Sequence, residues 1–493
     1  MMREPAEAGS ALDGSARAQP SHAIILGWRG RDLTVTPPAD LLPLDDAALA
    51  DALFGPRAMS LAPRLLRDRR GRFFRARPMD YEALRGALLA QAAAPLQTAF
   101  DPRPALPFTP RPTLEPRPYQ TEALTAWRAG GGRGVVTLPT GAGKTYLGAL
   151  AIADTGLWTL VVAPTIDLLG QWKRAMAEAL AAPPEMVGVY GGGAREIAPI
   201  TIITYDSALL RPELLWRFGL LIFDECHHLP AQTYRQIAEG AFTPLRLGLS
   251  ATPERADLLH IDLDQLIGPE VYRADPESLS ADHYLAGFQV ERVTVTLTPD
   301  ERARYDAARE TYRDFVRRRH LTIASPADFQ RKILWASARD PEARAAMLAW
   351  REARALALDA TAKLALLEDI LTRHHDERVL IFSEYNALVT EISQRFVMPS
   401  VTYLTPASER RAILEGFRAG RFTKLVSGRV LNEGVDIPDC GVAVIVSGNA
   451  TPREYIQRLG RILRPKATSA TLYELVTEDT TEERASTQRR RRG

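Results

Sequence analysis

Two features that define disulfide-stapled or membrane proteins are nearly missing from this chain. It has only two cysteines, Cys226 and Cys440, too few for a disulfide framework or a four-cysteine metal site. No apolar run approaches the roughly 20 residues that cross a bilayer. Residues 1–22 contain no apolar core of a secretory signal and predict a disordered tail. We therefore expect a protein of the reducing cytoplasm with no membrane partner.

Overall composition adds few constraints. At 493 residues the chain is long enough for roughly three domains of about 150 residues each. Hydrophobic residues make up 46% and charged residues 25% of it, as in ordinary globular proteins. A formal net charge of +2 neither favours nor excludes a polyanionic partner, so the distribution of the charge carries more information than its sum.

Arginines gather in one early segment that also holds Phe73 and Phe74. Arginine binds phosphates, and aromatic rings stack on bases, so this segment is a candidate nucleic-acid-binding surface. The shorter run Arg317–Arg319 is another candidate. A solvated arginine-rich face explains the early pattern equally well, and the sequence leaves both interpretations open. The early arginines lie at positions 64, 67, 69, 70, 72, 75 and 77, against a single acid.

Proline marks a domain boundary near residue 100. Residues 23–95 mix strand and helix patterns, and residues 96–113 then carry five prolines. So much proline forbids a helix and predicts an extended linker. After it, wholly apolar runs such as LWTLVVAP and LLIFDE alternate with helical stretches. This alternation is typical of a parallel sheet covered on both faces.

The alternation returns near residue 360, after a charged helical stretch without strand signals. We therefore predict an α/β protein with two tandem doubly wound parallel-sheet domains, a helical insertion between them and a small N-terminal α+β domain. The predicted bounds are 1–22 for the tail, 23–95 for the N-terminal domain, 96–113 for the linker, 114–298 and 360–478 for the α/β domains, 299–359 for the insertion and 479–493 for a basic tail.

A glycine-bearing loop follows the first apolar strand after the linker. VVTLPTGAGKTYLGAL predicts a strand, a loop and a helix that begins near Lys144. Backbone N–H groups and the positive helix end would bind a phosphate. Lys144 would neutralise the β- and γ-phosphates of ATP, and Thr145 would place its hydroxyl on Mg²⁺. The residues expected to bind the nucleotide here are Thr140, Gly141, Ala142, Gly143, Lys144 and Thr145.

Two adjacent acids end another buried strand, in LLIFDECHHLP. Asp224 would hold Mg²⁺, mostly through water, while Glu225 would polarise the attacking water. The following Cys226, His227 and His228 do not form a zinc site, because three contiguous residues on one turn cannot converge on a tetrahedral ion. His227 would instead link the nucleotide site to the neighbouring motif.

Further candidates lie far from these motifs. Arg117 and Gln120 precede the loop, and Gln120 offers the donor and acceptor that an adenine edge requires; a helix start after Pro118 is the alternative. Arg461 and Arg464 share a helix face, and phosphoryl transfer needs a cation at the γ-phosphate. Because they are so distant from the loop in sequence, a second domain would supply them when an interdomain cleft closes. A surface basic helix is the simpler alternative.

Taken in order, these motifs resemble superfamily 2 helicases over nearly four-fifths of the chain, and the short PTGxGKT loop is usual in that class. The resemblance implies two RecA-like domains, with ATP and Mg²⁺ in the cleft between them. It implies that Ser250, Thr252 and Gln457 couple hydrolysis to movement with His227, and that Asp436 approaches the ribose. By the same resemblance, the strand-contacting residues include Pro164, Thr165, Thr204 and Gly434.

The resemblance narrows further. DECHHLPA, the run from LGLSATPERAD to LIGPEVY, and SGNATPREYIQRLGRILRPK are similar to XPB-type DNA repair helicases of archaea and bacteria. An Arg-Glu-Asp motif that helps open DNA in that family aligns with Arg255, Ala256 and Asp257, so its acid is missing here. The insertion after Thr298 matches the family's helical thumb in position, and residues 23–95 match its damage-recognition domain in position only.

These resemblances imply an ATP-dependent DNA helicase or translocase, moving 3′ to 5′ on single-stranded or forked DNA as a monomer in nucleotide excision repair. An RNA helicase, a restriction-type DNA translocase and the motor subunit of a nuclease complex are alternatives, the last with a nuclease partner. A nucleic-acid-binding module with a dead ATPase is the alternative from another class. The intact Lys144, Asp224 and Glu225 argue against it.

Overall fold

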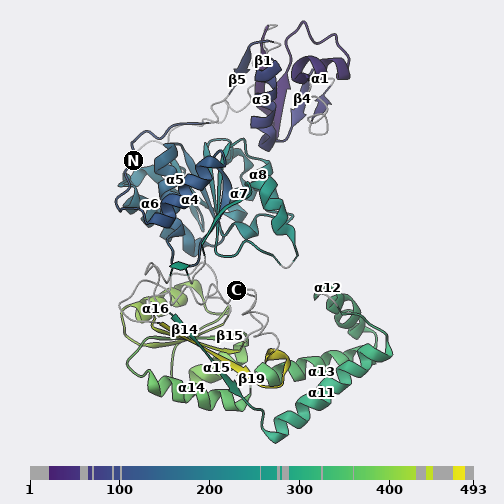
Figure 1. Ribbon diagram of the computed structural model, residues 1–493, viewed down its shortest axis with the longest axis vertical. Helices are drawn as coiled ribbons and strands as arrows, with labels where there is room; N and C mark the ends of the chain where they lie inside the picture. The colour runs from purple at the N-terminus through teal and green to yellow at the C-terminus, as the bar shows by residue number, and fades with distance from the viewer. Residues whose placement is uncertain are drawn as a thin grey trace, which may run out of the picture. The chain divides into compact units, whose positions relative to one another are not determined.

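The computed structural model describes residues 22–55, 65–68, 72–91, 94–99, 103–255, 257–274, 278–279, 288–323, 326–358, 360–428, 440–447 and 470–483. The chain divides into two compact units. The first comprises Met1–Leu138 and Gly143–Ala274, and the second Pro139–Ala142 and Asp275–Gly493. Figure 1 colours the elements from purple at the N-terminus to yellow at the C-terminus. Among the described residues, no helix is both long and apolar enough to span a bilayer.

The first unit begins with a small mixed sheet, in which β1 runs parallel to β5 and the other pairings are antiparallel. Its strands, in the order β3-β4-β2-β1-β5, are β3 (Leu66–Asp68), β4 (Phe73–Ala76), β2 (Asp32–Thr36), β1 (Ile24–Arg29) and β5 (Leu96–Thr98). Its helices are α1 (Asp46–Phe54), the 3₁₀ turn η3 (Pro78–Asp80) and α3 (Tyr81–Gln91). Apolar side chains from both layers form one core.

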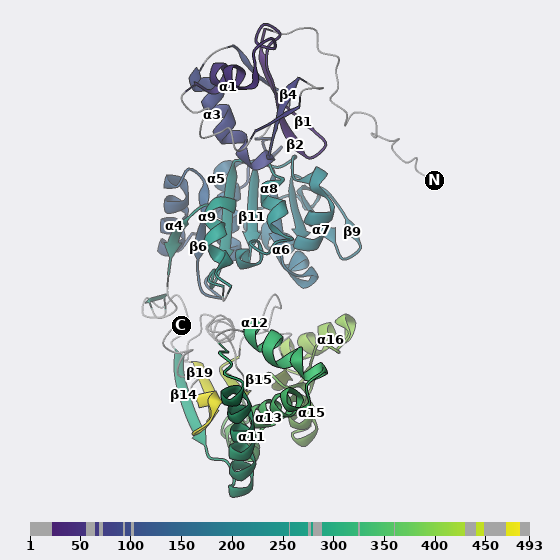
Figure 2. The same ribbon diagram turned by 90° about the vertical axis from the view of Figure 1, so that its right-hand side faces the viewer.

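A parallel sheet dominates the rest of the first unit, with helices on both faces (Figure 2). Only β9 runs antiparallel among its described pairings, to β8. Its strands, in the order β13-β6-β12-β11-β7-β10-β8-β9, are β13 (Glu270–Arg273), β6 (Arg133–Thr137), β12 (Leu245–Ser250), β11 (Leu220–Asp224), β7 (Thr159–Ala163), β10 (Ile200–Thr204), β8 (Val187–Gly191) and β9 (Ala194–Arg195). Its helices and 3₁₀ turns are α4 (Pro118–Ala129), α5 (Lys144–Thr155), α6 (Ile166–Ala179), η4 (Pro184–Met186), α7 (Tyr205–Leu210), η5 (Pro212–Leu214), η6 (Cys226–His228), α8 (Arg235–Glu239), η7 (Leu259–Asp262) and α9 (Leu263–Leu266).

Aromatic side chains join the two sheets of the first unit. Phe242 lies in the core of the N-terminal sheet, with its ring 6.2 Å from that of Tyr81. Trp216 lies 5.7 Å from Trp28 across the same seam. Aromatic pairs at such separations stabilise beyond the apolar area that they bury. The N-terminal sheet therefore shares core with the parallel sheet and is not merely tethered to it.

The proline-rich segment packs along the parallel-sheet domain. Leu106 N donates to Gly156 O over 2.7 Å, and Thr113 N donates to Ala179 O over 2.9 Å. In the other direction, Trp158 N donates to Pro104 O over 2.8 Å. Proline keeps the segment extended, and its remaining N–H groups still find carbonyl partners. The predicted linker was expected to begin at residue 96. Its first three residues instead form β5, which pairs with β1 in the N-terminal sheet.

The second unit contains another parallel sheet, of order β14-β19-β18-β15-β17-β16. Its strands are β14 (Phe288–Val295), β19 (Ala470–Thr477), β18 (Val442–Ser447), β15 (Val379–Ser383), β17 (Lys424–Ser427) and β16 (Ser400–Val401). Its helices include α14 (Thr361–Arg373), α15 (Asn386–Arg395) and α16 (Ala407–Arg418). Strand β14 pairs with β19 along its whole length, although its residues were expected in the first domain, which was predicted to end at residue 298. Strand pairing between distant segments leaves no local signal, so the boundary was placed too late.

Between β14 and α14 the chain forms a helical arm that projects from the second sheet (Figure 1). Thr298 caps the first arm helix, and Glu301 completes the cap by accepting from the Thr298 N–H. Tyr305 and Ala308 on that helix pack with Ala353 and Ala357 on the returning one. The arm consists of α11 (Pro299–Arg318), α12 (Pro326–Phe329), the π-turn η8 (Gln330–Leu334), the 3₁₀ turn η9 (Ala336–Ala338) and α13 (Pro341–Leu358).

Candidate nucleotide site and nucleic-acid contacts

The loop between β6 and α5 carries the residues expected to bind phosphate. Gly141 and Gly143 have φ values of +86° and +78°, a region that side chains other than glycine rarely adopt. A Cβ added to Gly143 would also lie 2.7 Å from the Gln120 Nε2 atom. Helix α5 begins at Lys144, directly after this glycine. Thr140, Ala142 and Thr145 lie in the same loop or in the first helical turn.

Lys144 lies between the loop and the acids of β11. Its Nζ atom is 3.3 Å from the Leu138 carbonyl oxygen and 3.6 Å from the Glu225 Oε1 atom. Both side chains are largely enclosed, so their attraction is only partly screened by water. The structure thus brings together a lysine and a glutamate that are separated by 81 positions in the sequence.

Gln120 is held against the same loop. Its Oε1 atom accepts from the Arg117 N–H over 3.0 Å, and its Nε2 atom donates to the Gly143 carbonyl over 3.4 Å. The Arg117 guanidinium donates to the Tyr119 hydroxyl over 3.0 Å. These contacts fix the amide beside the glycine loop. Recognition of adenine by Gln120 stays a prediction.

Asp224 is the last residue of β11 and Glu225 follows it, and their environments differ. The Asp224 carboxylate accepts from the Trp172 indole N–H over 2.8 Å and from the Glu225 N–H over 3.0 Å. Burial, followed by the adjacent Glu225 charge, raises the pKa of Asp224 above its usual range, while the Trp172 hydrogen bond and Lys144 oppose this shift. A bound divalent cation would also favour the ionised carboxylate.

His227, Glu225 and Ser250 converge beside this pair of acids. The His227 Nδ1 atom lies 3.2 Å from the Ser250 Oγ atom and 3.4 Å from the Glu225 Oε2 atom. The Ser250 hydroxyl lies 3.4 Å from the same carboxylate oxygen and accepts from the Thr252 N–H over 3.1 Å. One hydroxyl therefore joins the end of β11 to the residues that follow β12.

Arg255 and Asp257 pair with each other. The Arg255 guanidinium bridges both Asp257 carboxylate oxygens, at 2.9 and 2.6 Å, and donates to the His227 carbonyl over 2.7 Å. The hydrogen bonding of Arg255 to the Asp257 carboxylate lowers the pKa of Asp257 to about 2. The pair therefore braces a turn, and any role in DNA contact stays a prediction. Ala256 lies outside the described residues.

Three of the expected strand-contacting residues lie at one edge of the first parallel sheet. Pro164 and Thr165 follow the end of β7, and Thr204 ends β10, the adjacent parallel strand. The Thr204 hydroxyl caps α7 by accepting a hydrogen bond from the Ser207 N–H over 3.1 Å. One of its hydrogen-bonding positions is therefore already occupied. The carboxyl ends of parallel strands form the usual ligand-binding edge of such sheets.

Several expected site residues lie outside the residues that the structure describes. They are Arg461, Arg464, Asp436, Gly434 and Gln457.

The early arginine segment does not offer rings for base stacking. Phe73 and Phe74 lie on β4 and are only 6% and 4% exposed. Phe74 belongs to the core of the N-terminal sheet, whereas Arg29 and Arg75 lie 5.7 and 5.8 Å from the centre of the Phe73 ring. Arg75 pairs with Asp32 and Asp68, and Arg67 covers the Phe74 ring at 4.9 Å. The expectation that these phenylalanines stack on bases was wrong, since successive side chains of a strand point to opposite faces and the rings on both faces of β4 are covered here.

Trp172 and Tyr205, which contact Asp224 in the candidate nucleotide site, were not predicted from the sequence. Trp172 on α6 reaches Asp224, and the Tyr205 hydroxyl donates to the Asp224 carbonyl over 3.1 Å. Each lies in a motif that was expected to contact DNA. No local pattern connects either residue to an acid on another strand, so only the packed sheet reveals the contacts.

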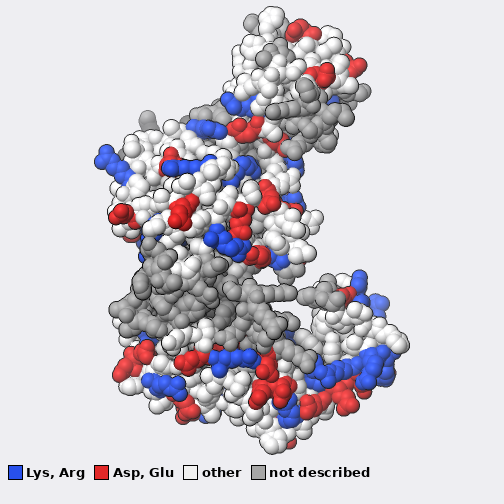
Figure 3. Space-filling view, viewed as in Figure 1, with Lys and Arg blue, Asp and Glu red and all other residues white. Residues whose placement is uncertain are grey.

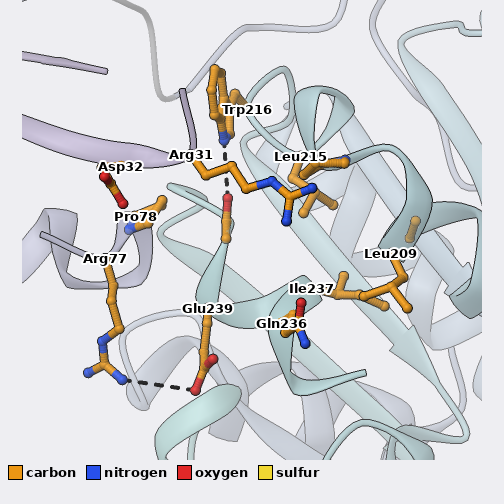
Figure 4. Close-up of a pocket in the computed structure, with 13 residues that line it drawn as sticks. Arg31, Asp32, Arg77, Pro78, Leu209, Leu215, Trp216, Gln236, Ile237 and Glu239 are labelled. Atoms are coloured by element: carbon orange, nitrogen blue, oxygen red, sulfur yellow. Dashed lines mark hydrogen bonds and ion pairs between the residues drawn. The ribbon is translucent and has the colours of Figure 1, made fainter. Parts of the chain in front are cut away.

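A pocket of about 190 Å³ lies in the seam between the N-terminal sheet and the parallel sheet. Figure 4 shows Arg77 reaching Glu239 across the seam. The Arg77 Nη1 atom lies 3.9 Å from the Glu239 Oε1 atom. Trp216 and Gly240 line the pocket and precede the first residues of β11 and β12. The site candidates Asp224 and Ser250 are the last residues of the same two strands. The pocket and the candidate nucleotide site therefore lie at opposite edges of the sheet.

Comparison with known proteins decides the family. The model of the type III restriction enzyme res subunit matches residues 113–255, and that of the helicase conserved C-terminal domain matches residues 362–466. The chain is 43% identical over 378 residues to the DNA 3′-5′ translocase XPB2 of Sulfurisphaera tokodaii, covering 76% of this chain and 85% of that protein. This chain belongs to the XPB family of superfamily 2 helicases. The resemblance inferred from the motifs is thus confirmed.

Other XPB-family members are longer than this chain. The DNA 3′-5′ helicase XPB of Mycobacterium tuberculosis is 33% identical over 387 residues, which cover 76% of this chain and 63% of that protein. Among solved structures, the Pyrococcus furiosus Hef helicase domain matches with a TM-score of 0.55 and 20% identity, over 76% of this chain and 98% of that one. The last match concerns the fold, and it confirms the two RecA-like parallel-sheet domains predicted from the sequence.

Proposed function

We propose that this XPB-family protein hydrolyses ATP and uses the energy to move 3′ to 5′ along DNA, separating strands at forks. The observation that carries the proposal is the cluster of Lys144, Glu225, His227 and Ser250 at the carboxyl edge of the first parallel sheet. A charged lysine beside a water-activating carboxylate is the arrangement that phosphoryl transfer to water requires. The names of the relatives supply the substrate and the direction.

The residues at the end of β11 and the start of α5 suit Mg²⁺. Asp224 and Thr145 supply the hard oxygen ligands that this ion prefers, and it usually keeps several waters. Burial and then the adjacent Glu225 charge raise the pKa of Asp224, and a divalent cation would oppose this shift by favouring the ionised carboxylate. Asp224 and Thr145 would hold the ion, which supplies charge neutralisation at the phosphates. Glu225 would orient the attacking water, with His227 and Ser250 fixing the carboxylate.

Arg461 and Arg464 are the proposed cations at the γ-phosphate, and Asp436 the proposed ribose contact. The second unit contributes these residues in this proposal, so hydrolysis requires both units. Phosphoryl-transfer enzymes lose roughly a thousandfold or more in rate without such an arginine. An isolated first unit should therefore bind nucleotide and hydrolyse it very slowly.

The discriminating experiment measures ATP turnover with no nucleic acid, single-stranded DNA, forked DNA or RNA of matched length. The proposal predicts stimulation by both DNAs and little by RNA. The variant Glu225→Gln should bind ATP yet lose about a hundredfold in turnover, because it loses the positioned base. Equal stimulation by RNA would favour the RNA-helicase alternative. Near-normal turnover of Glu225→Gln would overturn the site assignment.

The biological setting is part of the proposal. Excision repair is the role implied by resemblance to XPB-type repair helicases, and a nuclease is the candidate partner. We propose that the motor itself acts as a monomer. Sedimentation with and without forked DNA tests the last point, since a dimer at assay concentrations would contradict it.

A further inference from the structure

The outer part of the arm, residues 311–344, combines an exposed tryptophan with surplus positive charge; we refer to it as the arm tip. Trp335 is 63% exposed, and the preceding Leu334 is 45% exposed. The arm tip carries eight arginines and lysines against four carboxylates. Figure 3 shows blue side chains gathered over the outer part of the arm. Aromatic rings placed among cations are the elements of single-strand binding surfaces.

Trp335 reaches the surface because the helix before it contains one extra residue. Its N–H donates to the Gln330 carbonyl over 2.9 Å, five positions back, and Gln330–Leu334 forms a π-turn. Ile333 stays in the small core of the tip with Phe315, while Leu334 and Trp335 face outward. Such turns are rare, and they are frequently found at functional sites.

Hydrogen bonds brace this turn on both sides. Lys332 Nζ donates to the Thr322 carbonyl over 2.7 Å, and the Ser337 hydroxyl donates to the Leu334 carbonyl over 2.7 Å. Arg344 Nε then donates to the Ser337 carbonyl over 3.1 Å. The backbone that presents the indole is thus fixed before any ligand arrives, which lowers the entropic cost of binding.

Lys332 lies three positions before Trp335, and Arg331 and Arg339 are the nearest arginines in sequence, four positions before and after it. Arg331 is 66% exposed and shares Asp328 with Lys332. Arg339 is exposed and makes no ion pair with any other residue that the structure describes. Both guanidinium groups are on the surface, where a phosphate can compete with or add to their partners.

We propose that the arm tip binds single-stranded DNA by stacking Trp335 on an unpaired base, with Arg331 and Arg339 on the flanking phosphates. This inference rests on the DNA substrate of the proposed function and adds a base contact to it. Every base has a π-face, so the contact is independent of sequence. Bases inside a duplex already stack on each other, so the tip selects unpaired strand over duplex.

The test uses the full-length protein and fluorescence anisotropy with two labelled strands of equal length, an oligo(dT) and an abasic strand with the same phosphates. Trp335→Ala should weaken oligo(dT) binding about tenfold or more and leave abasic binding unchanged. Its salt slope should stay the same, because stacking releases no counterions. Trp335→Phe should retain most of the affinity. Arg331→Ala with Arg339→Ala should instead flatten the slope by about 0.7 units per lost contact.

Leu348→Ala is the matched control, because it removes another exposed apolar side chain, 54% exposed, from α13 of the same arm. It should bind both strands as the wild type does. Equal losses on both strands for Trp335→Ala, or no loss on either, would overturn the proposal; unchanged DNA binding would point to a protein partner at this surface. The proposed function is judged separately, since DNA-stimulated turnover by the wild-type protein does not depend on the stacking result.

Discussion

The Arg255 guanidinium donates to the backbone carbonyl of His227 over 2.7 Å while it bridges Asp257. His227 in turn lies 3.2 Å from Ser250 and 3.4 Å from Glu225. A turn expected to act on DNA is thus joined to the candidate nucleotide site by a single side chain. Since the Arg255 guanidinium is partly shielded from water, loss of its hydrogen bond to the His227 carbonyl should affect both the turn and the candidate nucleotide site.

Arg255→Ala should lower strand separation by more than it lowers ATP turnover without DNA. The turn then loses both its Asp257 bridge and its contact with His227, while Lys144 and Glu225 keep theirs. The matched variant Asp257→Asn removes only the charge of the bridge and should cause a smaller loss. Fork-unwinding and ATPase assays on the same preparations measure both quantities. Equal unwinding by Arg255→Ala and wild type would refute the link.

Trp172→Phe should raise the Mg²⁺ concentration needed for half-maximal turnover. The indole N–H stabilises the ionised Asp224, so its loss leaves a carboxyl that ionises less readily and binds cations more weakly. Trp127→Phe is the control, because that buried indole donates to the Arg246 carbonyl over 2.9 Å, away from the acids of β11. The two variants should lose similar thermal stability, and a Mg²⁺ shift in both would contradict the assignment.

The arm is tied to the second sheet through Arg354. Its guanidinium lies 5.3 Å from the Trp350 ring and 3.1 Å from the Glu384 carboxylate, just after β15. Trp350 lies 4.5 Å from Phe329 at the end of α12. Contacts therefore run from the arm tip to the strand edge of the second unit.

Arg354→Met should reduce the stimulation of ATP turnover by DNA several-fold without changing DNA affinity. Methionine keeps apolar packing on Trp350 but removes the ion pair with the nearly buried Glu384. Arg304→Met serves as the control, since its pair with Glu352 in the same arm is exposed on both sides and such pairs contribute about 1 kcal/mol or less. Normal stimulation in Arg354→Met would show that the arm does not communicate with the sheet in this way.

Local sequence predicted where the candidate nucleotide residues lie because strand ends and glycine loops leave short-range signals, whereas their roles stay predictions. Asp224 ends an apolar run that forms a buried strand, Glu225 follows it directly, and Lys144 follows the glycine loop after another such run. Trp172 carried no such signal, because its contact with Asp224 depends on how α6 packs against β11. Charge and aromatic content gave a wrong prediction at Phe73, since composition does not say which side chains of a strand are covered. Likewise, no local sequence pattern predicts that β14 pairs with β19.

The most direct test of the central claim is displacement of streptavidin from biotinylated single-stranded DNA. A motor moving 3′ to 5′ runs toward the 5′ end, so the wild-type protein with ATP and Mg²⁺ should free streptavidin from a 5′-biotin far faster than from a 3′-biotin. Glu225→Gln should free neither, because movement requires hydrolysis. Faster release from the 3′-biotin, or release by Glu225→Gln at the wild-type rate, would contradict the account.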